Sequence, residues 1–163
     1  MANVVSRGVA AIGLSIALCL ALACASGGPT YSELEGTLPG IPSGSGRILF
    51  YMTDAVEVPT FRPDLTVDGV IEGEIRAGTF FYLDRPAGVH QLGVHAKPVD
   101  AAFGGQGATQ PIVLELAPGQ RAYIRVDVDA PAGMVMPVLT PETAENGQRD
   151  MARLVQIQPG QDP

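Results

Sequence analysis

The chain has 163 residues, with ten basic and 17 acidic side chains, a net charge of −7 at pH 7 and an isoelectric point near 4.6. This length predicts one folded domain, and an acidic chain with a single lysine is poorly suited to binding nucleic acid, because phosphates require many cations. Only one apolar run approaches the ~20 residues that a membrane-spanning helix needs, which excludes a multi-span membrane protein.

Residues 1–23 are typical of a secretory signal peptide. Arg7 and the amino terminus supply a weak positive region, and Val9–Ala23 is the apolar stretch. Small residues precede Cys24, and this arrangement resembles the processing box of bacterial lipoproteins. The resemblance implies cleavage before Cys24 and attachment of a diacylglycerol and fatty acids such as palmitate to that residue, which would anchor the protein in a membrane. The alternatives are an ordinary cleaved signal and an uncleaved anchor helix.

The residues after Cys24 predict where the protein goes. Residue 25 is alanine and not aspartate, which by resemblance to the bacterial sorting pattern favours the outer membrane, with the domain facing the periplasm. Display on the cell surface is the alternative. Residues 24–45 are rich in glycine, proline and serine, which predicts a flexible tether.

From Gly46 onward, short runs of β-branched and aromatic residues alternate with turn residues such as Asp68-Gly69 and Pro86-Ala87-Gly88. The predicted strands are Arg47–Thr53, Leu65–Val67, Val70–Ile75, Thr79–Asp84, Val89–Ala96, Pro111–Leu116 and Arg121–Asp129, with Met134–Leu139 as a candidate last strand. About seven such strands predict a mainly β fold, a single antiparallel β-sandwich of the immunoglobulin-like or prealbumin-like kind over residues 46–157.

The end of the chain departs from this pattern. Thr140 as N-cap and Pro141 at the first position predict a short C-terminal helix, although Gly147 weakens it. Residues 158–163 are predicted to be a disordered tail, and Val99–Gln110 is predicted to be a loop rich in glycine and alanine.

Three stretches are similar to a bacterial lipoprotein family known only as a domain of unknown function. They are Gly46–Tyr51 (G-x-I-x-F-Y), Pro86–Leu92 (P-x-G-x-H-x-L) and Pro118–Val126, which fits P-G-x-x-Y-Y-x-R-V except that Ala122 replaces the first aromatic residue. The family resembles small β-sandwiches built around a Pro-Glu-Gly-Ala turn, which are themselves like the regulatory domain of some carboxypeptidases. It has no established catalytic residues, so the resemblance implies none for this chain.

The strongest candidate for binding is a row of side chains on the predicted strand Arg121–Asp129. The strand alternates strictly, which predicts one buried face and one face open to water, with Arg121, Tyr123 and Arg125 on the open face. Two guanidinium groups beside a phenol suit a carboxylate, a sugar or a partner surface. The alternative is pairing with Glu115 or with aspartates on neighbouring strands.

Other chemistry is weakly supported. His90 and His95 fall on opposite faces of one predicted strand, so they are not expected to bind one metal ion together. We expect His90 at the rim of the core and His95 on the surface. Asp127 and Asp129 share a strand face and could contribute oxygen ligands to a calcium ion. The interpretation that they are ordinary solvated surface residues is favoured over a calcium site. The sequence therefore predicts no metal, no cofactor and no catalytic residue.

We expect a lipid-anchored envelope module that is not an enzyme and binds an envelope protein or a glycan, or has a structural role. The alternative is a periplasmic hydrolase with a site built from loops. Such an enzyme would gather Asp84, His90 or Asp127 in one cleft with perturbed ionisation.

Overall fold

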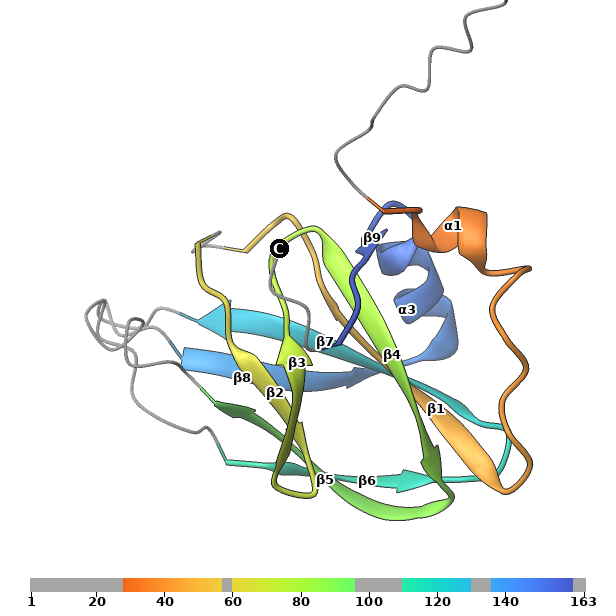
Figure 1. Cartoon of the computed structure of the whole chain (residues 1–163). Helices are drawn as coiled ribbons and strands as arrows, with labels where there is room; N and C mark the ends of the chain where they lie inside the picture. Colours follow the sequence, from red (N-terminus) through yellow and green to blue (C-terminus); the bar gives the residue numbers. More distant parts are fainter. Residues whose placement is uncertain (1–27, 57–59, 96–109, 130–135, 160–163) are drawn as a thin grey trace, which may run out of the picture.

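The computed structural model describes residues 28–56, 60–95, 110–129 and 136–159, and over these ranges the chain is mainly β, with two sheets (Figure 1). The predicted signal peptide over 1–23, Cys24, most of the predicted loop Val99–Gln110 and residues 160–163 lie outside the described residues. Within the described ranges, no helix combines the length and the hydropathy needed to cross a bilayer.

One sheet has five strands, and β1 lies at its centre. Their order is β8 (Met136–Glu142), β7 (Arg121–Asp129), β1 (Ser45–Met52), β4 (Thr79–Pro86) and β9 (Val155–Gln156). Strand β1 is buried on both faces from Gly46 to Met52, as its apolar residues predict. The prediction of a purely antiparallel fold is wrong for this sheet, because β1 runs parallel to β7 and β4 parallel to β9. Both pairs are joined by long connections, which allow parallel strands where a tight turn would not.

The second sheet has four antiparallel strands in the order β3 (Val70–Glu74), β2 (Asp64–Val67), β5 (Gly88–His95) and β6 (Ile112–Leu116). The turn between β2 and β3 consists of Asp68 and Gly69, with φ angles of 53° and 80°. Two positive φ angles are typical of the type I′ turn that a two-residue hairpin prefers. This confirms the turn that the Asp-Gly pair predicts.

Both sheets contribute to one buried apolar cluster. From β7 it includes Ala122, Ile124, Val126 and Val128, which confirms the predicted inward face of that strand. The other strands of the two sheets supply Ile48, Phe50, Met52, Leu65, Val67, Phe81, Leu83, Leu92, Val94, Leu116 and Leu139. Burial of this apolar surface between the sheets is the main force that stabilises the fold.

The outer face of the five-stranded sheet carries a second buried cluster and is covered by two helices, α1 (Tyr31–Leu34) and α3 (Ala144–Met151) (Figure 1). The members of the cluster are Tyr31, Leu49, Tyr51, Phe80, Tyr123, Met151 and Leu154. The face of β7 that was predicted to be open to water is therefore partly covered.

Part of the segment that was predicted to be a tether, residues 24–45, packs against the folded body. The Tyr31 side chain is 1% exposed, and Thr30 forms an isolated bridge with Val155. Ser45 belongs to β1. The composition, which is rich in glycine, proline and serine, does not predict this packing, because a few aromatic and apolar side chains are enough to hold the segment on the sheet.

The predicted C-terminal helix exists, but it begins at a different residue. Thr143 is its N-cap, and the Thr143 Oγ1 accepts the Asn146 N–H at 3.2 Å. The expected cap Thr140 and the following Pro141 lie in β8, which pairs with β7 as far as Glu142. Strand β8 is at the edge of its sheet, where a proline is tolerated because no neighbour needs its missing N–H.

Candidate functional site

The outer face of the four-stranded sheet carries exposed apolar side chains. Ile71, Val89 and Val113 are 58–69% exposed, and they are three of the five large apolar residues that are exposed in the described part of the chain. Isolated exposed apolar residues are ordinary, whereas several on one sheet face mark a candidate interaction surface.

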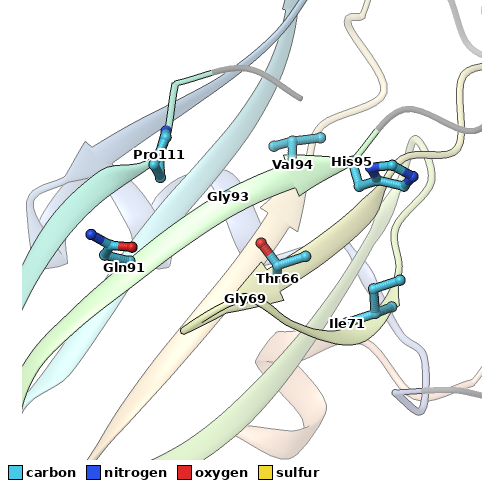
Figure 2. A pocket seen from close by; sticks show the side chains of 8 residues that line it. All are labelled: Thr66, Gly69, Ile71, Gln91, Gly93, Val94, His95 and Pro111. Atoms are coloured by element: carbon cyan, nitrogen blue, oxygen red, sulfur yellow. The ribbon is translucent and has the colours of Figure 1, made fainter. Parts of the chain in front are cut away.

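A shallow hollow of about 320 Å³ lies on this face, and its floor is the backbone of Gly93 in β5 (Figure 2). Gly93 lies opposite Thr66 of β2, and a Cβ at Gly93 would lie 2.6 Å from the Thr66 Oγ1. The missing side chain is therefore what opens the hollow. Gln91 and His95 flank Gly93 two residues away on the same face of the strand, because side chains alternate along β5.

The lining of this hollow, which we call the Gly93 groove, combines apolar surface with neutral polar groups. Ile71 of β3 and Pro111, which precedes β6, supply apolar surface, while Thr66, Gln91 and His95 supply a hydroxyl, an amide and an imidazole (Figure 2). Among the described residues that line it, none carries a carboxylate or a guanidinium. Such a surface suits an uncharged or apolar segment of a ligand, held by a few hydrogen bonds.

The structure does not present Arg121, Tyr123 and Arg125 as an exposed row. Tyr123 is 2% exposed within the second cluster, and its hydroxyl lies 3.3 Å from the Tyr31 hydroxyl. Arg121 is half-buried. The prediction of an open face is wrong at Tyr123, because α1 and α3 pack over this part of β7.

Arg125 belongs to a network of ion pairs. Its guanidinium lies 2.8 Å from Asp127, 2.9 Å from Glu142 and 3.9 Å from Asp150, whose elements are β7, β8 and α3. The hydrogen bond with Asp127 is the largest of the effects that raise the pKa of Arg125. The alternative interpretation of this row was pairing with Glu115 or with aspartates on neighbouring strands. Arg125 does pair with acidic side chains, but its cross-strand partner is Glu142, while Asp127 lies on the same strand and Asp150 on α3.

Asp127 also accepts a hydrogen bond from the Thr140 hydroxyl at 3.3 Å. Its carboxylate is therefore already engaged by two side chains, which disfavours a calcium site built on Asp127 and Asp129. In the described ranges, no group of three or more histidine, cysteine or acidic residues is placed to hold a metal ion.

His90 links the β2–β3 turn to the end of β4 and is 8% exposed, at the rim of the core as predicted. Its Nδ1 lies 2.8 Å from the Asp68 carboxylate in the β2–β3 turn, and its Nε2 lies 2.8 Å from the carbonyl of Pro86 at the end of β4. Both partners are acceptors, so both ring nitrogens must carry protons to complete the two bonds. The hydrogen bond to Asp68 and then that to Pro86 raise the pKa of His90, while His90 lowers the pKa of Asp68.

A buried cation lies at the start of β1. The Arg47 side chain is 0% exposed, and its guanidinium forms two hydrogen bonds with Asp84 of β4, at 2.7 and 2.8 Å. The guanidinium also stacks 4.2 Å from the centre of the Tyr82 ring. The hydrogen bond to Asp84 is the largest of the effects that raise the pKa of Arg47, and the two bonds link β1 to β4.

The three residues proposed for a hydrolase have separate partners. Asp84 pairs with Arg47, and Asp127 pairs with Arg125. His90 bonds to Asp68. The described residues do not bring these three side chains into one shared network.

Sequence reasoning missed the Gly93 groove. The available signal was a glycine inside an otherwise regular strand pattern, which often marks a close approach of a neighbouring chain or a ligand. His95 was predicted to be an ordinary surface residue, and it is exposed at one end of this groove.

Comparison of the chain with protein-family models, with curated proteins and with solved structures finds no match in any of the three.

Proposed function

We propose that the chain is a lipid-anchored β-sandwich of the bacterial envelope that acts as a binding module without catalysis, with the Gly93 groove and its apolar surroundings as the binding face. The anchor is the lipidated Cys24, and the location is the outer membrane, with the domain facing the periplasm. A sandwich of the immunoglobulin-like or prealbumin-like kind is supported by the buried cluster that both sheets share.

Membership in the lipoprotein family of unknown function is part of this proposal. It is supported by where the three matching stretches fall. Gly46–Tyr51 lies in β1, Pro86–Leu92 spans the turn into β5, and Pro118–Val126 spans the turn into β7. The motif residues thus build strands and the turns that precede them, which is consistent with a pattern that specifies a fold.

The exposed apolar residues around the groove are the observation that carries the binding function. Val89 and Val113 are 69% and 67% exposed, on the neighbouring strands β5 and β6. Val113 pairs in register with Gln91, which lines the groove. Apolar patches of this kind favour a protein partner, whereas glycan sites commonly use an aromatic platform, which the described lining of the groove lacks. We therefore propose an envelope protein as the partner.

The test is site-specific photocrosslinking in intact cells of the native source. A photoreactive residue at Gln91, in the groove, is compared with one at Gln148, exposed on α3. We expect a discrete adduct only from position 91, and we expect Val89→Lys together with Val113→Lys to abolish it without lowering the melting temperature. Equal adducts from both positions, or an adduct unaffected by the lysines, would overturn the assignment of this face.

Lipidation is tested separately, by labelling cells with radioactive palmitate. We expect label on the native chain, loss of label in Cys24→Ser, and accumulation of the unprocessed form when lipoprotein signal peptidase is inhibited. An unlabelled, freely secreted product would refute the anchor.

A further inference from the structure

The chain enters the folded body close to the predicted lipidation site. Residues Gly28–Ser32 run beside Ala152–Gln156, and three backbone hydrogen bonds of 2.9–3.2 Å join the two segments (Figure 1). Thr30 forms an antiparallel bridge with Val155 of β9. A Cβ on Gly28 would lie 2.8 Å from the carbonyl oxygen of Gln156, so the backbone is already in close contact at this residue.

The Tyr31 side chain fixes this segment to the sheet. Its ring packs edge-on against Phe80, with 5.4 Å between the ring centres and an interplanar angle of 87°. Desolvation by burial is the main cause that raises the pKa of Tyr31, so the phenol stays neutral. Pulling the segment away would expose this ring together with Phe80 and Tyr123, which makes detachment costly.

The connection between Cys24 and the body is therefore very short. Three residues, 25 to 27, separate Cys24 from Gly28. Their four Cα–Cα steps span at most about 14 Å when fully extended. A free tether over 24–45 would instead have allowed the domain to diffuse tens of ångströms from its anchor.

We propose, on the basis of the lipid anchor proposed above, that the end of the body formed by Gly28, the start of α1 and β9 lies directly on the lipid headgroups. The start of β4 lies at the same end, because the Val155 N–H donates to the Gly78 carbonyl at 3.0 Å. The helices lie on the outer face of one sheet (Figure 1), and the Gly93 groove lies on the outer face of the other. The proposed orientation would therefore leave the face with the groove uncovered by the helices and open to a partner.

We do not expect electrostatic attraction to lipid headgroups to attach this end of the body to the membrane. Arg76 and Arg153 lie near the start of β4 and β9, and Asp54 and Glu33 lie at the same end, so positive and negative charges balance. The body without its anchor should not bind vesicles, and the anchor alone should determine which end meets the membrane.

The test uses tryptophan as a reporter, because the chain contains none. The mature chain from Cys24 onward is prepared with Ser32→Trp, at the proposed contact end, or with Val113→Trp, beside the groove; both native side chains are exposed. Each variant is attached to vesicles with spin-labelled headgroups in two ways: through its native lipid, and through the Cys24 thiol coupled to a maleimide-bearing lipid.

We expect headgroup quenching to be several-fold stronger for Ser32→Trp than for Val113→Trp. A matched variant with twenty Gly/Ser residues inserted between residues 27 and 28 should lose this difference. Equal quenching at the two positions without the insert would overturn the proposal. If the native chain carries no lipid but the maleimide-coupled chain still shows the difference, the proposed anchor fails while the short connection and the orientation that it imposes stand.

Discussion

Single side chains in this protein acquire their roles from elements that are distant in the sequence. His90 was expected at the rim of the core, and it lies there, but its two acceptors come from the β2–β3 turn and from the end of β4. Arg47 begins the central strand, and Asp84, 37 residues later, compensates its buried charge. Neither partner follows from local spacing, because hydrogen bonds across a sheet depend on register.

The His90 contacts predict a pH-dependent contribution to stability. Its pKa is raised in the folded state, so the contribution is complete below the unfolded value near 6.5 and is lost as the pH rises through the folded value. The charged groups that face it are Asp68, which favours the imidazolium, and Arg85, which opposes it. Urea unfolding from pH 5.5 to 9 should show His90→Gln closest to the wild type at high pH and most destabilised at low pH.

His95→Gln is the matched control for this measurement, because His95 is exposed. Its difference from the wild type should be small throughout the range. A His90→Gln difference that grew as the pH rose would contradict the charged form of the imidazole, because that sign requires a lowered pKa.

At the scale of elements, the helix α3 covers part of the row that was predicted to bind a ligand, Arg121, Tyr123 and Arg125. It follows the edge strand β8 and packs over β7, where Gly147 lies against the Tyr123 ring. Glycine is the poorest residue in a helix apart from proline, so Gly147 counts against a helix when the sequence is considered alone. In the structure it is what lets the helix approach the sheet.

Gly147→Ala should therefore destabilise the protein, against helix propensity. An added Cβ would lie within about 2.5 Å of the Tyr123 side chain. Overpacking of this kind typically costs about 1–3 kcal/mol, and alanine gains roughly 1 kcal/mol over glycine in a helix. We expect a net loss of about 1 kcal/mol, the middle of the difference, in urea unfolding, whereas Gln148→Ala, on the exposed side of the same helix, should stay within about 0.5 kcal/mol. A more stable Gly147→Ala variant would show that Tyr123 can move aside.

At the scale of the whole molecule, the N-terminal segment is part of the body and not a spacer. It completes the cluster on the outer face of the five-stranded sheet, to which Tyr31 contributes a fully buried ring. The domain boundary predicted at residue 46 is therefore too late. If Cys24 carries the proposed anchor, the packing of residues 28–32 on the body leaves only a short connection to it, and this connection would turn a defined side of the domain toward the membrane.

Two truncated chains test this boundary. A chain of residues 28–163 should unfold like the mature protein, whereas a chain of residues 46–163 should lose at least about 3 kcal/mol of stability, the usual cost of removing a buried aromatic side chain. Thermal unfolding and binding of a hydrophobic dye distinguish the two. Equal melting temperatures for both chains would mean that residues 28–45 contribute nothing to the fold.

Several local features follow from residue patterns alone. The alternation of Ala122, Ile124, Val126 and Val128 predicts the inward face of β7, and the Asp68-Gly69 pair predicts its turn. The apolar residues on both sides of β1 predict a central strand. Each is a short-range signal that depends on φ angles or on the two-residue period of a strand.

The covered face of β7, the buried Tyr31 and the Gly93 groove could not be predicted in the same way. Each depends on which segment lies opposite, namely α3 over Tyr123, β9 beside Thr30 and Thr66 across from Gly93. The sequence by itself determined that this is a mainly β chain with strands and turns at given places, because backbone preferences are local. Only the tertiary structure decided which faces are buried and which surface is left open for a partner, because burial results from contacts between distant parts of the chain.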